Sequence, residues 1–170
     1  MTTEQIAVIA VTSIACVTDL RDRRIPNWLT FGAAGVGFLY NASVGGWSGL
    51  GTAGAGWLLG LAIFFVPFAL GGLGGGDLKL LAALGAWLGP TEVAWVAAFT
   101  CMAGAVLGLV VAFSAGYLRR AVSNIWVLLM HWRVSGLQPH PELTIHESKA
   151  PKLAYGIAIF TGTMVTVWIH

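Results

Sequence analysis

Charge is scarce in this sequence: only 9% of its 170 residues are Asp, Glu, Lys or Arg. A soluble domain carries roughly 25% charged residues, and a globule of this length still exposes about a third of its surface to solvent. A chain that is 57% hydrophobic, with a mean hydropathy of +0.80, cannot build such a water-facing surface. The composition therefore excludes an ordinary soluble enzyme, a nucleic-acid-binding protein and a disordered regulator. It predicts an all-α, polytopic membrane protein.

Cysteine is scarce as well. Cys16 and Cys101 lie far apart in apolar stretches, so they form neither a Cys-x-x-Cys pair nor a disulfide framework, and we interpret both as small packing residues. A cluster of histidines and glutamates could also be considered as a metal site, but it lacks the helical His-x-x-x-His spacing, and we interpret it as part of a solvated loop. It consists of His140, Glu142, His146 and Glu147. We therefore expect no metal and no cofactor.

Long apolar runs dominate what remains. A span needs about 20 apolar residues, because a helix rises about 1.5 Å per residue. Six candidate spans follow one another in a single integral-membrane domain, 1–170: residues 5–18 (extended by Asp19 and Leu20), 28–44, 51–70, 78–88, 93–118 and 153–169. The first has no basic segment before it and no small-residue cleavage site, so we interpret it as a retained helix. The fourth is short, and we expect it to tilt little, to lie in thinned bilayer or to stop short of the far face.

The basic residues give the orientation of these spans. If the N-terminus is outside, the cytoplasmic segments are 19–27, 71–79 and 119–152. All nine Lys and Arg residues fall in these segments, as the positive-inside rule predicts, whereas Glu4 and Glu92 fall outside. We therefore predict six spans with both the N-terminus and the C-terminus outside.

The cytoplasmic segment 119–152 contains a further predicted helix. Residues 125–130 are apolar, flanked by arginines and by Trp126 and Trp132, but they are too few to cross a bilayer. We predict a helix that lies in the plane of the interface. Residues 138–150, with two prolines, are predicted to be a mobile cytoplasmic loop.

Glycine pairs on one helix face predict close helix packing. The two pairs are Gly56 with Gly60, and Gly104 with Gly108.

Two carboxylates lie at membrane depth, where ionisable groups are costly and are candidates for function. Asp19 closes the first predicted span and Asp77 opens the fourth, both at the cytoplasmic ends. Two facing carboxylates share one proton, because like charges a few Å apart cannot both ionise easily. The ionised one can take a proton from an attacking water, while the protonated one donates a hydrogen bond to the peptide carbonyl. The pair thus suits an aspartic protease.

Structural interpretations of the same residues stay open at this point. Asp77 is a suitable N-cap for its helix, and Asp19 could be an ordinary charge beside the arginines that follow it. Asp22 and Lys79 are predicted to be interfacial ion-pair partners. The glycine-rich stretch 71–76 is a poor helix, so it leaves backbone groups free and can pass close to an extended substrate.

The motifs around both aspartates resemble those of the type IV prepilin peptidases. Gly74-Gly75-Gly76-Asp77, followed by Leu78-Lys79-Leu80, is similar to the G-x-G-D motif of that family. Asp19, followed after five residues by Ile25-Pro26-Asn27, resembles its first catalytic motif, whereas Asp22 does not occupy the motif position. The resemblance covers essentially the whole chain. It implies a bundle of six membrane helices in which Asp19 and Asp77 are catalytic, with motif support from Gly74, Gly76, Lys79, Ile25, Pro26 and Asn27.

Two departures refine the resemblance. The long members of the family carry a zinc-binding insertion with two Cys-x-x-Cys pairs that is linked to N-methylation, and two distant cysteines cannot build it. The chain therefore resembles the short, Tad/Flp-pilus-type members. Residues 155–159 resemble the closing Pro-Tyr-Gly-type segment of the family, but Ala154 stands where proline is usual. We interpret this segment as ordinary packing of the last helix.

The resemblance implies a peptidase of the bacterial inner membrane, with its active site near the cytoplasmic face. Its partners would be the lipid bilayer and the apolar helix of a prepilin or pseudopilin, whose leader it removes. A general membrane-protein protease of the same architecture stays open. So does a non-catalytic scaffold or proton-coupled transporter that uses Asp19 and Asp77 as structural or relay charges.

Overall fold

The computed structural model describes residues 1–116, 118–136 and 153–169, and within these ranges the regular elements are helices alone. They are α1 (Thr3–Asp22), α2 (Asn27–Ala69), α3 (Gly75–Ser114), α4 (Leu118–Ser135) and α5 (Tyr155–Ile169). The predicted all-α class is confirmed. By length and composition α1, α2 and α3 are able to cross a membrane, and α5 is a shorter apolar helix. The predicted loop 138–150 and the candidate metal set in it lie outside the described residues.

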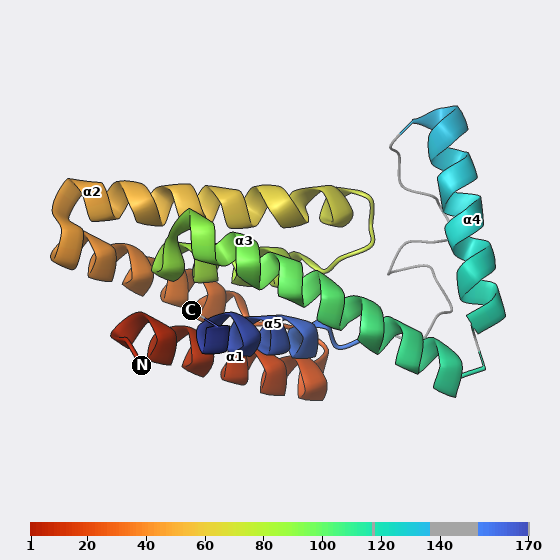
Figure 1. Cartoon of the computed structure of the whole chain (residues 1–170), viewed down its shortest axis with the longest axis horizontal. Helices are drawn as coiled ribbons and strands as arrows, with labels where there is room; N and C mark the ends of the chain where they lie inside the picture. The colour runs from red at the N-terminus through yellow and green to blue at the C-terminus, as the bar shows by residue number, and fades with distance from the viewer. Residues whose placement is uncertain (117, 137–152, 170) are drawn as a thin grey trace.

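Each of the two longest helices is divided by a glycine with a left-handed φ. Gly46 in α2 has φ 56° and ψ −136°, and Gly89 in α3 has φ 79° and ψ −179°. Figure 1 shows α2 folded back on itself as a hairpin. The helical segments are therefore 27–45 and 47–69 in α2, and 75–88 and 90–114 in α3. They correspond closely to the predicted apolar runs 28–44, 51–70, 78–88 and 93–118.

The break in α3 leaves carbonyl groups that another helix satisfies. Pro90 follows Gly89 and has no N–H to donate to the carbonyl of Ala86, its normal helical acceptor. Asn41 Nδ2 in α2 donates to Ala86 O at 3.0 Å and to Trp87 O at 3.2 Å. A polar side chain on one helix thus stabilises the reversal of its neighbour, since a buried carbonyl without a donor is costly.

Small residues let α2 and α3 approach closely. A Cβ atom added to Gly60 would lie 2.7 Å from Leu81 O, and one added to Gly56 would meet the backbone of α3 at Gly85 and Gly89. The close packing predicted for this pair is confirmed. In the second pair, Gly104 faces α5, but a Cβ atom added to Gly108 would meet no atom of the described residues within 4 Å, so the prediction of a shared close contact in that part of the chain is wrong.

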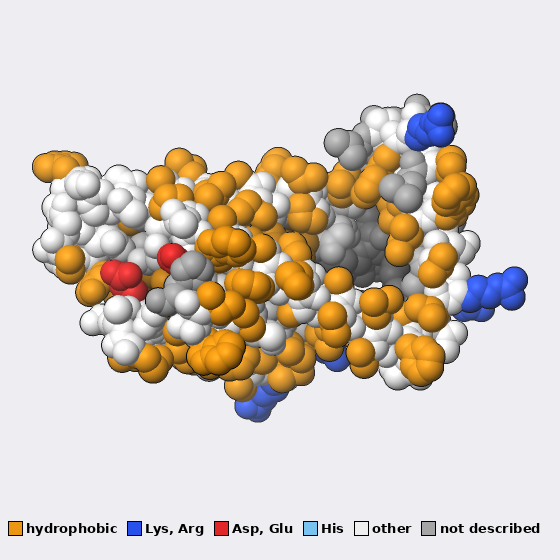
Figure 2. Space-filling model, in the orientation of Figure 1, with side chains coloured by type: hydrophobic (Ala, Val, Ile, Leu, Met, Phe, Trp, Pro, Cys, Tyr) orange, Lys and Arg blue, Asp and Glu red, His pale blue; other side chains and the backbone are white. Residues whose placement is uncertain are grey.

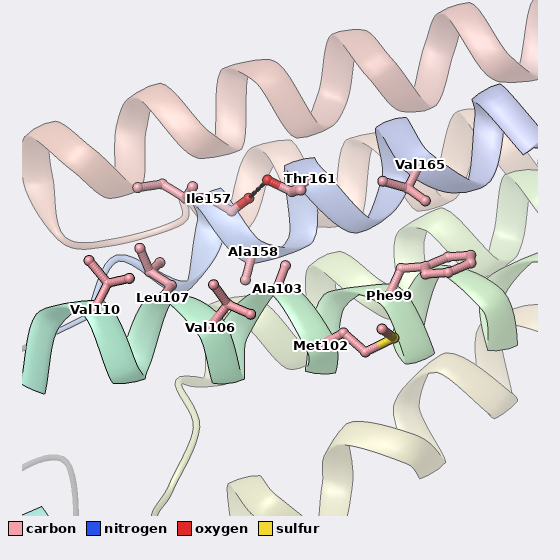
Figure 3. Close-up of a pocket in the computed structure, with 10 residues that line it drawn as sticks. All are labelled: Phe99, Met102, Ala103, Val106, Leu107, Val110, Ile157, Ala158, Thr161 and Val165. Carbon is pink, nitrogen blue, oxygen red and sulfur yellow. Dashed lines mark hydrogen bonds between the residues drawn. The ribbon is translucent and has the colours of Figure 1, made fainter.

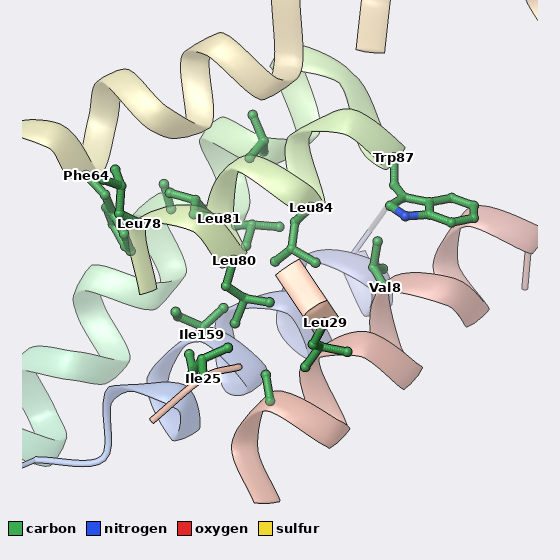
Figure 4. Close-up of a cluster of buried hydrophobic side chains, with 14 of the residues drawn as sticks. Val8, Ile25, Leu29, Phe64, Leu78, Leu80, Leu81, Leu84, Trp87 and Ile159 are labelled. Carbon is green, nitrogen blue, oxygen red and sulfur yellow. The ribbon is translucent and has the colours of Figure 1, made fainter. Parts of the chain in front are cut away.

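The first segment of α3 lies at the centre of the bundle. Its residues 80–84 are fully buried, and Figure 4 shows their leucines among side chains from α1, α2 and α5. A helix that is apolar on every side is expected to be surrounded by others. The labelled members of this core are Val8, Ile25, Leu29, Phe64, Leu78, Leu80, Leu81, Leu84, Trp87 and Ile159.

The helix α4 stands apart from the bundle. It lies crosswise to the other helices in Figure 1, and among the described helices it contacts only α3. Apolar side chains along it are exposed, including Val122, Ile125 and Trp126. The helix predicted between residues 119 and 136 is therefore present. Figure 2 shows acidic side chains toward one end of the molecule, whereas Lys and Arg lie at the middle of its lower edge and toward the end that carries α4.

Candidate active site

Asp19 lies buried in the last turn of α1, with only 8% of its surface exposed. Its Oδ2 atom accepts a hydrogen bond of 2.8 Å from the backbone N–H of Gly156, at the start of α5. The helix ends just beyond, where Arg23 adopts a left-handed conformation (φ 54°) and donates its N–H to Asp19 O at 3.0 Å. The carboxylate is thus held between the end of one helix and the beginning of another.

Asp77 is the third residue of α3 and is half-buried. The N-cap of this helix is Gly74, so the structural interpretation of Asp77 as the N-cap is wrong. Its carboxylate instead lies near the backbone N–H groups of Gly74 and of Asp77 itself. A carboxylate in the first helical turn suits the positive end of the helix dipole.

The structure brings the two aspartates together. They are close enough for the charge of Asp19 to act on Asp77, and the charge of Asp77 acts in turn on Tyr155 at the start of α5. We call Asp19 and Asp77 the aspartate pair. Asp22, one turn further along α1, is exposed. Among the described residues, no group of three or more His, Cys, Asp or Glu is arranged to hold a metal ion.

The residues that flank the aspartates in sequence also meet in space. A Cβ atom on Gly76 would lie 3.0 Å from the Cβ of Ile25. Lys79 Nζ donates to Asn27 Oδ1 at 2.9 Å and lies 5.4 Å from the centre of the Phe31 ring. The loop after α1 is therefore joined directly to the start of α3. Pro26 is the N-cap residue of α2, so it fixes where that helix begins.

The contacts of Lys79 correct one prediction. An interfacial ion pair with Asp22 was expected, but in the described part of the chain the Lys79 ammonium contacts an amide oxygen and an aromatic ring.

Sequence reasoning missed the contribution of Tyr155 and Gly156, which we call the α5 entry. These residues were interpreted as ordinary helix packing, yet Gly156 bonds Asp19 directly. Tyr155 packs against Gly104 and lies edge-on to Phe64, with ring centres 6.1 Å apart. The available signal was position, because the predicted topology places the start of the last span at the same membrane face as both aspartates.

An apolar groove of about 530 Å³ begins beside the α5 entry. Figure 3 shows it between the second segment of α3 and α5, with Ala103 and Ala158 lying between larger side chains such as Val106. One of its few polar side chains, Thr161, donates its hydroxyl to Ile157 O at 2.9 Å. The groove therefore presents an almost wholly apolar wall.

Comparison with known proteins gives a consistent result. A model of the type IV leader peptidase family matches residues 6–109, which include both aspartates. The prepilin leader peptidase/N-methyltransferases of Burkholderia pseudomallei strains 1026b and K96243 are each 50% identical to this chain over 50 residues. The aligned region covers 29% of this chain and 16% of the length of each relative. No solved structure matches.

Proposed function

Because the chain belongs to the type IV leader peptidase family, we propose that it is a membrane-embedded aspartic endopeptidase. Its substrates are type IV prepilin-like proteins, Flp-type prepilins in particular, from which it removes the leader peptide. The observation that carries this proposal is the aspartate pair: a buried Asp19 and a half-buried Asp77, on different helices and near enough to interact. No cofactor is part of the proposal.

The chemistry follows from two carboxylates that share a proton. The ionised carboxylate takes a proton from water as the water oxygen bonds to the peptide carbonyl carbon. The protonated carboxyl donates a hydrogen bond to the carbonyl oxygen, where negative charge develops. When the C–N bond breaks, the leaving amine takes the proton that the carboxylate had received from water. The products are the leader, with a new carboxylate, and the mature protein, with a new amine.

We propose six spans with both termini outside the bacterial inner membrane and the aspartate pair near the cytoplasmic face. The bends at Gly46 and Gly89 support this arrangement, because they divide the long helices into segments that match the predicted spans. The separation of acidic and basic side chains along the molecule agrees with the positive-inside rule. In this arrangement α4 lies in the interface, with its apolar side chains in lipid.

The apolar groove is the proposed place for the substrate's hydrophobic helix. It starts at Ile157, the residue after Gly156, so a helix lying in it presents its first residues to the aspartate pair. Cleavage just before an apolar helix needs this relation between groove and carboxylates. We further propose that the protein is a short Tad/Flp-type member without N-methyltransferase activity, since Cys16 and Cys101 lie in separate helices and form no Cys-x-x-Cys pair.

Cleavage of a purified Flp-type prepilin in detergent tests the proposal. The products are identified by mass, and the matched control is the same prepilin with the glycine before the cleavage site replaced by leucine. We expect one cut at the junction and little cleavage of the control. Equal cleavage of the control and of unrelated membrane proteins would indicate a general membrane protease. No cleavage of any substrate would favour the scaffold or the proton-coupled transporter.

A further inference from the structure

The backbone N–H of Gly156 has no acceptor in its own helix. Gly156 is the second residue of α5, and the first four N–H groups of a helix lack intrahelical partners. Asp19 from α1 supplies the acceptor, at 2.8 Å and in a buried setting. The N-terminal end of a helix also favours a negative charge beside it. The contact therefore joins the Asp19 carboxylate to the N-terminal end of α5, through an N–H group that has no acceptor within that helix.

A side chain at position 156 would be crowded against Asp19. A Cβ atom on residue 156 would lie 3.0 Å from both Cβ and Oδ2 of Asp19, and 3.4 Å from the carbonyl oxygen of Ala15. The distance to Ala15 O is an ordinary contact, so the Asp19 side chain is the neighbour that would have to move. Glycine at position 156 therefore lets α5 approach Asp19 without displacing its carboxylate.

Tyr155 fixes the position of Gly156 relative to α3. Its ring lies against Gly104, where an added Cβ atom would come within 2.8 Å of Tyr155 Oη, and its hydroxyl lies near the Cys101 side chain. Gly104 and Cys101 are both on α3, the helix that begins with Asp77. One short segment is therefore in contact with Asp19 and anchored to the helix that carries Asp77.

We propose that the α5 entry is the positioning element of the aspartate pair, an inference that rests on the proposed function. The Gly156 N–H holds Asp19 Oδ2, so Oδ1 is the oxygen left to act in hydrolysis. In the attacking step, a proton passes from water to one carboxylate oxygen of the pair as the water oxygen bonds to the carbonyl carbon. The carbonyl electron pair then moves onto its oxygen. With Oδ2 engaged by Gly156, the Asp19 carboxylate is restrained from rotating, and Oδ1 is the oxygen outside this bond.

A backbone ester at position 156 tests this role without adding any atom to the crowded site. Glycolic acid in place of glycine replaces the N–H by an oxygen and removes the bond to Asp19. No hydrogen-bond donor within α5 is lost, because this N–H has no helical partner, and the Tyr155 carbonyl becomes a weaker acceptor. We expect kcat for prepilin cleavage to fall about ten- to hundredfold, the range for a misplaced reacting group. KM should stay within about twofold, since the apolar groove is unchanged.

The same variant separates positioning from simple helix capping. If the ester protein melts at a lower temperature but its folded fraction keeps the wild-type kcat, the contact only caps α5 and the inference is overturned. The Asp19→Asn variant separates a failure of the positioning role from a failure of the proposed function. An inactive Asp19→Asn with a fully active ester variant contradicts the positioning role alone, whereas an active Asp19→Asn contradicts the proposed function.

Alanine variants give a second test if the ester protein does not accumulate. Gly104→Ala pushes on the Tyr155 ring, so we expect a lower kcat with a similar KM. Gly108→Ala is the matched control: it makes the same change one turn further along α3, where an added Cβ atom would meet no described atom within 4 Å. A wild-type kcat for Gly104→Ala, or an equal kcat loss for both variants, would overturn the proposal.

Discussion

Alanine at Gly76 and alanine at Gly75 are expected to change stability in opposite directions, although the two glycines are adjacent in one motif. Both are in the first turn of α3, where replacing glycine by alanine favours the helix by up to about 1 kcal/mol. A Cβ atom on Gly75 would lie 3.4 Å from the end of the Phe68 ring, an ordinary contact. A Cβ atom on Gly76 would lie 3.0 Å from Ile25 Cβ and 3.5 Å from Ile25 N and O.

The difference between Phe68 and Ile25 as neighbours determines how much each alanine changes the free energy of unfolding. Ile25 is 9% exposed and meets the new methyl group with its Cβ and backbone, so the loop after α1 must move as a whole. Overpacking of this kind costs about 1–3 kcal/mol. Gly75→Ala should therefore be as stable as the wild type or slightly more so. Gly76→Ala should be less stable than Gly75→Ala by about 1–3 kcal/mol, a difference of several degrees in melting temperature.

Thermal unfolding in detergent, followed by tryptophan fluorescence, measures this difference, and prepilin cleavage measures its consequence. Asp77 follows Gly76 directly, so a shift of the backbone moves one carboxylate of the aspartate pair. We expect Gly76→Ala to lose about ten- to hundredfold in cleavage rate and Gly75→Ala to stay within about twofold of the wild type. Equal melting temperatures and equal rates for the two variants would refute the packing argument.

Three further predictions concern the support of the site, the substrate and the topology. A double-mutant cycle of Lys79→Met and Asn27→Ala should give a coupling free energy of about 0.5–1 kcal/mol in unfolding, since an exposed hydrogen bond joins the two side chains; a value of zero would show that the bond contributes nothing. A photo-crosslinker at Thr161 should capture a prepilin through its apolar helix, and an equal yield with a substrate lacking that helix would contradict binding in the apolar groove. In a background without the native cysteines, Ser48→Cys should react with an impermeant maleimide on intact cells and Ser123→Cys only after the membrane is opened, and the reverse order would invert the proposed topology.

Local chemistry made much of the fold predictable. The apolar runs are separated by Gly46 and by Gly89 with Pro90, so the hydropathy pattern along the sequence predicts where each run ends. The structure bends at these glycines. The hydrogen-bond partner of the freed Ala86 carbonyl was not predictable in this way. Asn41 lies in the second predicted span and Ala86 in the fourth, and no local pattern relates the two. Contacts between distant segments depend on how helices pack, and hydropathy alone does not give that.

The candidate site was predictable to a similar degree. Asp19 and Asp77 were selected because carboxylates are costly at membrane depth, and the structure places them near each other. The interpretation of Asp77 as the N-cap of α3 is wrong because the helix begins earlier, with Gly74 as its N-cap residue. Gly156 was not identified as part of the site, since it acts through its backbone N–H and every residue except proline carries that group.

The central claim is that the two aspartates of the pair carry out hydrolysis, and single asparagine variants test it most directly. Asparagine keeps the size of the side chain but cannot act as a carboxylate acid or base. We measure prepilin cleavage by the wild type, Asp19→Asn and Asp77→Asn, with Asp22→Asn as the exposed, matched control. The account predicts that each variant of the pair loses on the order of 10³-fold or more, while Asp22→Asn cleaves near the wild-type rate. Near-wild-type cleavage by Asp19→Asn or Asp77→Asn, or loss of cleavage in Asp22→Asn with Asp19→Asn still active, would contradict it.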